Sequence, residues 1–113
     1  MKPTHWRLVC VLLTLGVGVL ALLPQPPAGL TSGWDKANHA LAFAALCASG
    51  RLAWPTLPAP WQALAWLGYG GLIEVLQTQL PPRQGEAADV LADALGIALG
   101  LIASSAWRRL RSR

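Results

Sequence analysis

Four long apolar stretches run along the chain, separated by short segments that are polar or rich in proline. The stretches cover about residues 8–23, 37–54, 61–80 and 87–107. Each approaches the ~20 residues with which an α-helix crosses ~30 Å of hydrocarbon. A backbone in lipid must satisfy its own hydrogen bonds, and a helix does so within one segment. The pattern therefore predicts an all-α protein: a single domain, residues 1–113, that forms an integral membrane bundle of four transmembrane helices.

Prolines and tryptophans mark the ends of these stretches. Proline removes a backbone donor and disfavours helix in the residue before it. Prolines lie in all three gaps, as Pro24, Pro26 and Pro27, then Pro55, Pro58 and Pro60, then Pro81 and Pro82. An indole ring suits the headgroup layer of a membrane. Most of the tryptophans lie at expected helix ends, as Trp6, Trp34, Trp54, Trp61 and Trp107.

The composition supports lipid as the solvent of these helices. Apolar residues make up 54% of the chain and charged residues 12%, about half the charged share of a soluble domain. So few charges leave too little polar surface to cover a soluble core. A net charge of +4 would suit nucleic acid. However, the basic residues flank apolar runs and form no patch interleaved with stacking aromatics, so we expect no nucleic-acid partner.

The distribution of Lys and Arg predicts the direction of the helices. The two termini and the connection between the second and third stretches would share one side, which holds Lys2, Arg7, Arg51, Arg108, Arg109, Arg111 and Arg113. The other side holds Lys36 and Arg83. The positive-inside rule then places both termini in the cytoplasm and predicts a multi-pass protein of the cytoplasmic membrane. The first stretch also resembles a signal peptide, but Pro24 follows it in place of a small-x-small cleavage site, which favours an uncleaved helix.

A set of polar positions within and beside the apolar stretches includes all five carboxylates of the chain. The set is Asp35, Lys36, His39, Glu74, Gln77, Gln79, Arg83, Gln84, Glu86, Asp89 and Asp93. In the predicted orientation, all of them fall in the outer half of the bundle or in its outer loops. A charge at mid-bilayer costs ~3 kcal/mol. We therefore expect the helix-borne members to face the bundle interior and to form one outward-facing cluster.

Spacing places several of these side chains on shared helix faces, because residues three and four apart are neighbours on a helix surface. Such pairs are Asp35 with His39, Glu74 with Gln77, and Asp89 with Asp93. Gly96 and Gly100 continue the last stripe and allow close helix contact. At ~1.5 Å rise per residue, Glu74 and Asp93 lie on the order of 10 Å inward from their helix ends. The cluster is then either a functional pocket or a hydrogen-bonding network that specifies packing.

The order of these residues resembles the VanZ-like family of membrane proteins. That family has Asp-Lys with a following His, then Glu-x-x-Gln and an Arg, then Asp-x-x-x-Asn-x-x-Gly-x-x-x-Gly. The chain reads WDKANHALAFAAL from Trp34 and IEVLQTQLPPRQGEAADVLADALGIALG from Ile73, so the likeness covers about residues 34–101. The matching positions are Asp35, Lys36, His39, Glu74, Gln77, Arg83, Asp89, Gly96 and Gly100. Asp93 departs from the pattern, because it stands where the family has Asn and adds an acid at the deepest point.

The resemblance implies a protein of the bacterial cell envelope. The family takes its name from low-level resistance to teicoplanin and has no established biochemical mechanism. On this basis we expect the polar cluster to bind a lipid headgroup, a cell-wall intermediate or a glycopeptide, and to contribute to glycopeptide resistance. The lipid bilayer is the expected partner of the helices.

Two other functions stay open. A membrane enzyme would act on a lipid-linked substrate, with His39, Glu74, Asp89 and Asp93 as acids and bases. These residues could also hold a divalent ion. However, the sequence has no H-E-x-x-H motif and no nucleophile elbow, so no catalytic residue, metal or cofactor is assigned. Transport is the third function, for which four helices would need a homo-oligomer, and no inverted repeat is visible.

Overall fold

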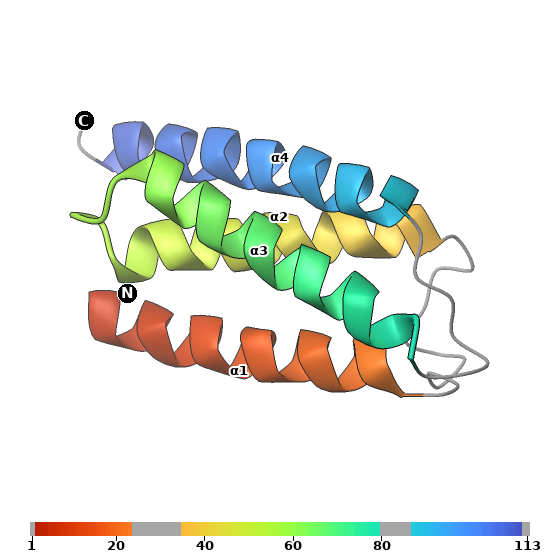
Figure 1. Cartoon of the computed structure of the whole chain (residues 1–113). Helices are drawn as coiled ribbons and strands as arrows, with labels where there is room; N and C mark the ends of the chain where they lie inside the picture. Colours follow the sequence, from red (N-terminus) through yellow and green to blue (C-terminus); the bar gives the residue numbers. More distant parts are fainter. Residues whose placement is uncertain (1, 24–34, 80–86, 112–113) are drawn as a thin grey trace.

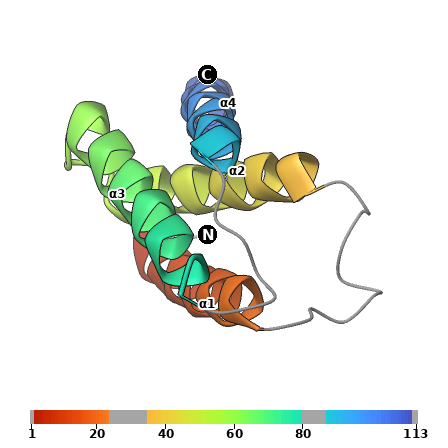
Figure 2. The same ribbon diagram turned by 45° about the vertical axis from the view of Figure 1, so that its right-hand side comes forward.

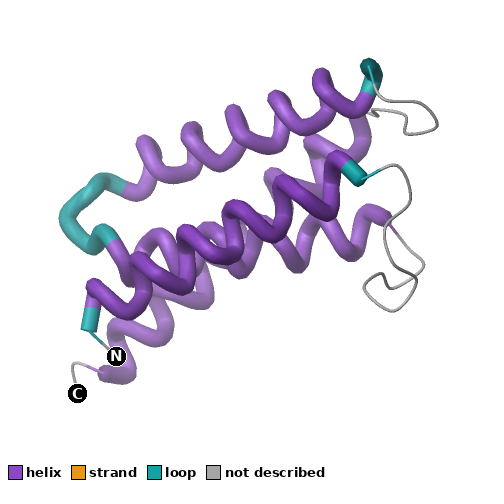
Figure 3. The backbone as a smooth tube through the Cα atoms, turned by 90° about the horizontal axis from the view of Figure 1, so that it is seen from below, coloured by secondary structure: helices purple, strands orange, loops and turns teal. Residues whose placement is uncertain are grey.

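The chain folds into α-helices, which confirms the predicted all-α class. In the computed structural model, residues 2–23, 35–79 and 87–111 are described. The helices are α1 (Pro3–Leu22), α2 (Asp35–Ala53), α3 (Ala59–Gln77) and α4 (Ala87–Arg111). Figure 1 shows them side by side, with neighbours in the sequence running in opposite directions. Helix is the only regular structure in this part of the chain (Figure 3).

The helix limits differ from the apolar stretches mainly at polar flanks. Helix α1 begins at Pro3 instead of Leu8, because the first turn of a helix tolerates the missing N–H of proline. Helix α4 continues through the basic residues to Arg111. Hydropathy marks the part of a helix that suits lipid, whereas backbone hydrogen bonding continues beyond it. The break between α2 and α3 lies at the expected prolines, with Pro58 at the start of α3; the other two expected breaks lie outside the described residues.

Helix α2 is the centre of the bundle. It packs most extensively against α4 and then against α1, and Figure 2 shows it between these two helices. Helix α3 contacts all three others. The buried apolar core joins three helices and consists of Phe43, Leu46, Cys47, Ile73 and Ile97.

Two glycines let α4 approach α2 closely. A Cβ on Gly96 would overlap the carbonyl group of Ala40, and a Cβ on Gly100 would overlap the carbonyl oxygen of Ala44. Small residues at such contacts let two helix backbones come together. This packing sets the separation of α2 and α4, and therefore the distance between polar side chains near the end of the bundle where both helices begin.

The outward faces of the helices are apolar. On α1 only Cys10 is buried, whereas Leu8, Leu12, Leu15 and Val19 are each more than half exposed. Large exposed apolar side chains continue on the other helices, with Leu41, Leu64, Leu72, Val75, Leu91, Leu95 and Ile102 among them. Soluble monomeric proteins rarely expose large apolar patches. Two helical segments, Pro3–Leu22 and Asp89–Arg111, are long and apolar enough to cross a membrane, with mean hydropathies of 1.9 and 1.7.

Candidate functional site: a buried cluster of one histidine and three acids

Most of the expected site residues lie near one end of the bundle. This is where α1 and α3 end and where α2 and α4 begin (Figure 1). Here α2 supplies His39, α3 supplies Glu74 and Gln77, and α4 supplies Asp89 and Asp93. Asp35 and Lys36 open α2, but their side chains are outside the described part of the structure, and so is the whole of Arg83.

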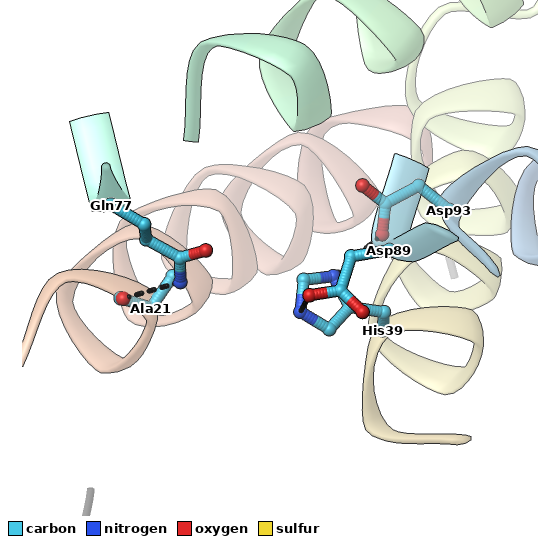
Figure 4. Close-up of polar contacts among 5 residues, drawn as sticks. All are labelled: Ala21, His39, Gln77, Asp89 and Asp93. Carbon is cyan, nitrogen blue, oxygen red and sulfur yellow. Dashed lines mark hydrogen bonds and ion pairs between the residues drawn. The ribbon is translucent and has the colours of Figure 1, made fainter. Parts of the chain in front are cut away.

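His39 and Asp93 join α2 to α4 by a side-chain hydrogen bond. Nδ1 of His39 lies 2.8 Å from Oδ1 of Asp93, and Nε2 lies 3.7 Å from Oδ2 of Asp89. Asp89 and Asp93 are one turn apart on α4, so one carboxylate lies at each nitrogen of the same ring (Figure 4). The His39 side chain is 16% exposed, which leaves the ring accessible at its edge. A protonated His39 would form ion pairs with both acids.

Glu74 brings α3 into the same cluster. Glu74 is buried, and one of its oxygens lies within 4.8 Å of a ring nitrogen of His39 and of an oxygen of Asp93. Gly70 lies one turn before Glu74, and a Cβ at this position would overlap Oδ2 of Asp93. Glycine therefore leaves the space beside α3 that the Asp93 carboxylate occupies. The sequence indicates that a neighbour approaches the helix at this glycine or that the helix bends there, but it does not identify Asp93 as that neighbour.

The cluster concentrates acids in an apolar interior. Asp93, Asp89 and Glu74 are 0%, 6% and 7% exposed. Buried carboxylates are stable only when they are paired, hydrogen-bonded or bound to a metal. Asp93 is hydrogen-bonded through Oδ1 only, because Oδ2 has no hydrogen-bond partner in the described part of the chain. The geometry therefore favours a cationic group beside Asp93.

Gln77 lies apart from the cluster, although its spacing groups it with Glu74. Its Nε2 donates a hydrogen bond of 2.8 Å to the carbonyl oxygen of Ala21 (Figure 4). The last four carbonyls of a helix have no partner within that helix, and Ala21 is in the last turn of α1. Gln77 thus gives a hydrogen-bond donor to a carbonyl group at the end of α1, and this bond connects α3 to α1.

Two further polar side chains of α3 make hydrogen bonds away from the cluster, one to α1 and one to the connection that follows α2. The Tyr69 hydroxyl donates a hydrogen bond of 2.6 Å to the Thr14 carbonyl, and Gln62 Nε2 donates one of 3.0 Å to the Trp54 carbonyl. Sequence analysis did not single them out. Each is an isolated polar residue within an apolar stretch. From the sequence alone, such a residue could either bind a ligand or make a packing contact between helices.

The opposite end of the bundle is basic. A hollow of about 620 Å³ is lined there by Lys2, His5, Trp6, Arg51, Arg108 and Arg111, together with apolar residues. None of the carboxylates in the described part of the chain lines it. Among the side chains that the structure describes, buried acids therefore lie near one end of the bundle, and basic side chains surround an open hollow at the other.

Comparison with known proteins gives no match. No family model matches the sequence, and no match was found among curated proteins or solved structures. The VanZ-like resemblance therefore rests on the ordered motif residues alone and stays a prediction. The geometry of the cluster allows it to bind a cationic group, to exchange a proton with a ligand, or to coordinate a metal ion.

Proposed function

We propose that this chain is a multi-pass protein of the cytoplasmic membrane, in which all four helices cross the bilayer and both termini lie in the cytoplasm. Helices α2 and α3 have 19 residues each, which span roughly 28 Å at a rise of 1.5 Å per residue. This length suits the ~30 Å hydrocarbon layer. Polar residues of the cluster lower the hydropathy of both helices without shortening them. Exposed Leu41 and Leu72 give each of them an apolar outer face.

The separation of charges supports the orientation. Basic side chains around the hollow, such as Arg51, Arg108 and Arg111, lie at the end that would face the cytoplasm. The acids of the cluster would then lie toward the outer face. A ligand from the outer leaflet or from the cell wall could reach His39, whose side chain is 16% exposed.

The proposed role of the cluster is to bind the cationic part of a lipid headgroup, a cell-wall intermediate or a glycopeptide. The observation that carries this proposal is the gathering of Glu74, Asp89 and Asp93 around His39 inside an apolar bundle. Carboxylates hold ammonium groups through charge-assisted hydrogen bonds. A network that only specified packing would be satisfied by neutral amides and hydroxyls. Ionisable residues inside a membrane protein cost free energy to bury, and they usually have a function.

The proposal agrees with the resemblance to the VanZ-like family, and glycopeptide resistance gives it a cellular test. We would express the wild type and Glu74→Gln in a bacterial host, measure teicoplanin susceptibility, and identify co-purifying lipids by mass spectrometry. Glu74→Gln keeps the shape of the side chain and removes its charge. The control is Ser104→Ala, which alters a buried polar residue of α4 outside the cluster, bonded to the Leu101 carbonyl.

We expect Glu74→Gln to lose the bound ligand and any shift in susceptibility, while Ser104→Ala retains both. Size-exclusion chromatography in detergent checks that both variants are folded. If folded Glu74→Gln and the wild type give the same lipids and the same susceptibility, the cluster is not the binding site.

A membrane enzyme that acts on a lipid-linked substrate is the second candidate. The observation that favours it is the 2.8 Å contact between His39 Nδ1 and Asp93 Oδ1. A carboxylate in this position orients an imidazole, so that the ring can serve as a general base. In this candidate, His39→Gln abolishes turnover of a lipid-linked substrate by purified protein but retains lipid binding. Unchanged turnover in His39→Gln would exclude this role.

A further inference from the structure

We propose that the cluster is a binding site for a divalent transition-metal ion of the zinc class, with His39, Glu74 and Asp93 as ligands. The proposal rests on the cation-binding role of the cluster proposed above, and it takes an inorganic cation in place of an organic one as the group that the acids hold. The three ligands come from α2, α3 and α4, one from each helix.

The positions of the donor atoms carry the first part of the argument. One ring nitrogen of His39 and one oxygen each of Glu74 and Asp93 lie within 4.8 Å of one another. Donors that share a Zn²⁺ ion at bonds of about 2.0–2.2 Å are separated by roughly 3.5 Å. Side-chain rotations that move each donor by about 1 Å would therefore close the site around an ion without moving the helices.

Asp93 provides an independent observation. It is 0% exposed, and Oδ2 is buried with no hydrogen-bond partner among the residues that the structure describes. Figure 4 shows one Asp93 oxygen directed at the His39 ring and the other directed away from it. This second oxygen lies against Gly70, one turn from Glu74 on the same helix. A buried carboxylate oxygen in this state needs an explanation, and an ion held between α3 and α4 supplies one.

Asp89 adds the partner that a metal-bound histidine needs. A histidine that binds a metal through one nitrogen almost always donates a hydrogen bond from the other, commonly to a carboxylate. His39 has a carboxylate at each nitrogen, Asp93 at 2.8 Å and Asp89 at 3.7 Å. Since Asp93 is itself a proposed ligand, Nδ1 is the nitrogen that would face the ion, and Asp89 beside Nε2 would fix the orientation of the ring.

The donor set indicates the class of metal. Mg²⁺ and Ca²⁺ prefer sites made of oxygen alone, whereas an imidazole with two carboxylates suits Zn²⁺ and its neighbours in the first transition row. The sequence contains no local metal-binding motif such as H-E-x-x-H. The structure shows why none is visible, since residues 39, 74 and 93 are far apart along the chain and meet only through helix packing.

Metal content of the purified protein tests the proposal. The full chain is purified in mild detergent without a polyhistidine tag, incubated with zinc chloride, dialysed against zinc-free buffer, and analysed by inductively coupled plasma mass spectrometry. We expect about one zinc per chain, and a loss of affinity of about tenfold or more in His39→Ala and Asp93→Asn. His5→Ala is the matched control, because it removes a histidine that lies in the basic hollow at the other end.

Cobalt(II) gives a spectroscopic readout that does not depend on measuring the zinc content. Co²⁺ bound by the wild type at an imidazole–carboxylate site should show visible ligand-field bands, and these should vanish in Glu74→Gln while the helical circular dichroism is retained. Wild-type protein that binds neither zinc nor cobalt overturns the metal site. So does zinc binding that is equal in His39→Ala and the wild type. If the wild type binds no metal but its lipid or glycopeptide ligand still depends on Glu74, the metal proposal fails and the binding function stands.

Discussion

Gly70 on α3 and Asp93 on α4 lie so close that a Cβ at position 70 would overlap Oδ2 of the aspartate. The same carboxylate reaches His39 on α2 through Oδ1, at 2.8 Å. Asp93 thus lies where three helices meet, and the absence of a side chain at position 70 makes its position compatible with close packing. The position of the Asp93 carboxylate therefore depends on glycine at position 70.

Replacement of Gly70 by alanine should destabilise the protein. The added methyl group would push Asp93 away from α3 and strain its bond to His39, at a cost of about 1–3 kcal/mol, typical of overpacking. The measurement is the thermal unfolding midpoint in detergent. Gly68→Ala is the control, because nothing lies within 4 Å of a Cβ there, and alanine in a helix is more stable than glycine by about 0.5–1 kcal/mol. Equal shifts in both variants would contradict the contact.

The bond between His39 and Asp93 should appear as a coupling energy in a double-mutant cycle. In metal-free buffer, His39→Leu leaves Asp93 buried without its hydrogen-bond partner, so we expect a loss of about 3–5 kcal/mol. The double variant His39→Leu/Asp93→Leu removes both polar groups and should lose less than the sum of the two single variants. Unfolding free energies of the four proteins give the coupling. Strictly additive effects would mean that the two side chains do not interact.

The helices could be predicted from the sequence, because a long apolar run has one stable backbone state in lipid. Most residues of the cluster could also be predicted from the sequence. His39, Glu74, Asp89 and Asp93 are ionisable residues inside apolar stretches, and burial in the bundle interior is the way to keep them out of lipid. Helix periodicity then puts Asp89 and Asp93 on one face, and the structure places both against a single imidazole ring.

The sequence does not predict which neighbouring helix each polar side chain of α3 contacts. Glu74 and Gln77 are three residues apart, yet Glu74 meets the cluster and Gln77 meets the last turn of α1. Periodicity states which residues share a face of one helix, but it does not state which neighbour each part of that face contacts. Helix α3 contacts all three other helices, so a small rotation about its axis decides the partner. The role of Gly70 depends on the same packing.

Gln77→Leu tests the separation of Gln77 from the site. The variant removes the hydrogen bond to the Ala21 carbonyl, so we expect a loss of about 1 kcal/mol in unfolding free energy. Zinc content and lipid retention should stay at wild-type levels. Gln79→Leu is the control, because Gln79 is exposed and surface changes usually stay within about 0.5 kcal/mol. A variant with wild-type stability and no bound ligand would instead place Gln77 in the site.

The orientation of the bundle can be tested at the connection between α2 and α3, which we expect in the cytoplasm. Thr56 is exposed there, so Thr56→Cys should react with a membrane-impermeant thiol reagent after permeabilisation but not in intact cells. The native Cys10 and Cys47 are 2% and 0% exposed, which keeps their background labelling low. A reporter fused to the C-terminus should likewise be active in the cytoplasm. Labelling of Thr56→Cys in intact cells would invert the orientation and would place the acidic cluster at the cytoplasmic face, out of reach of ligands from the cell wall.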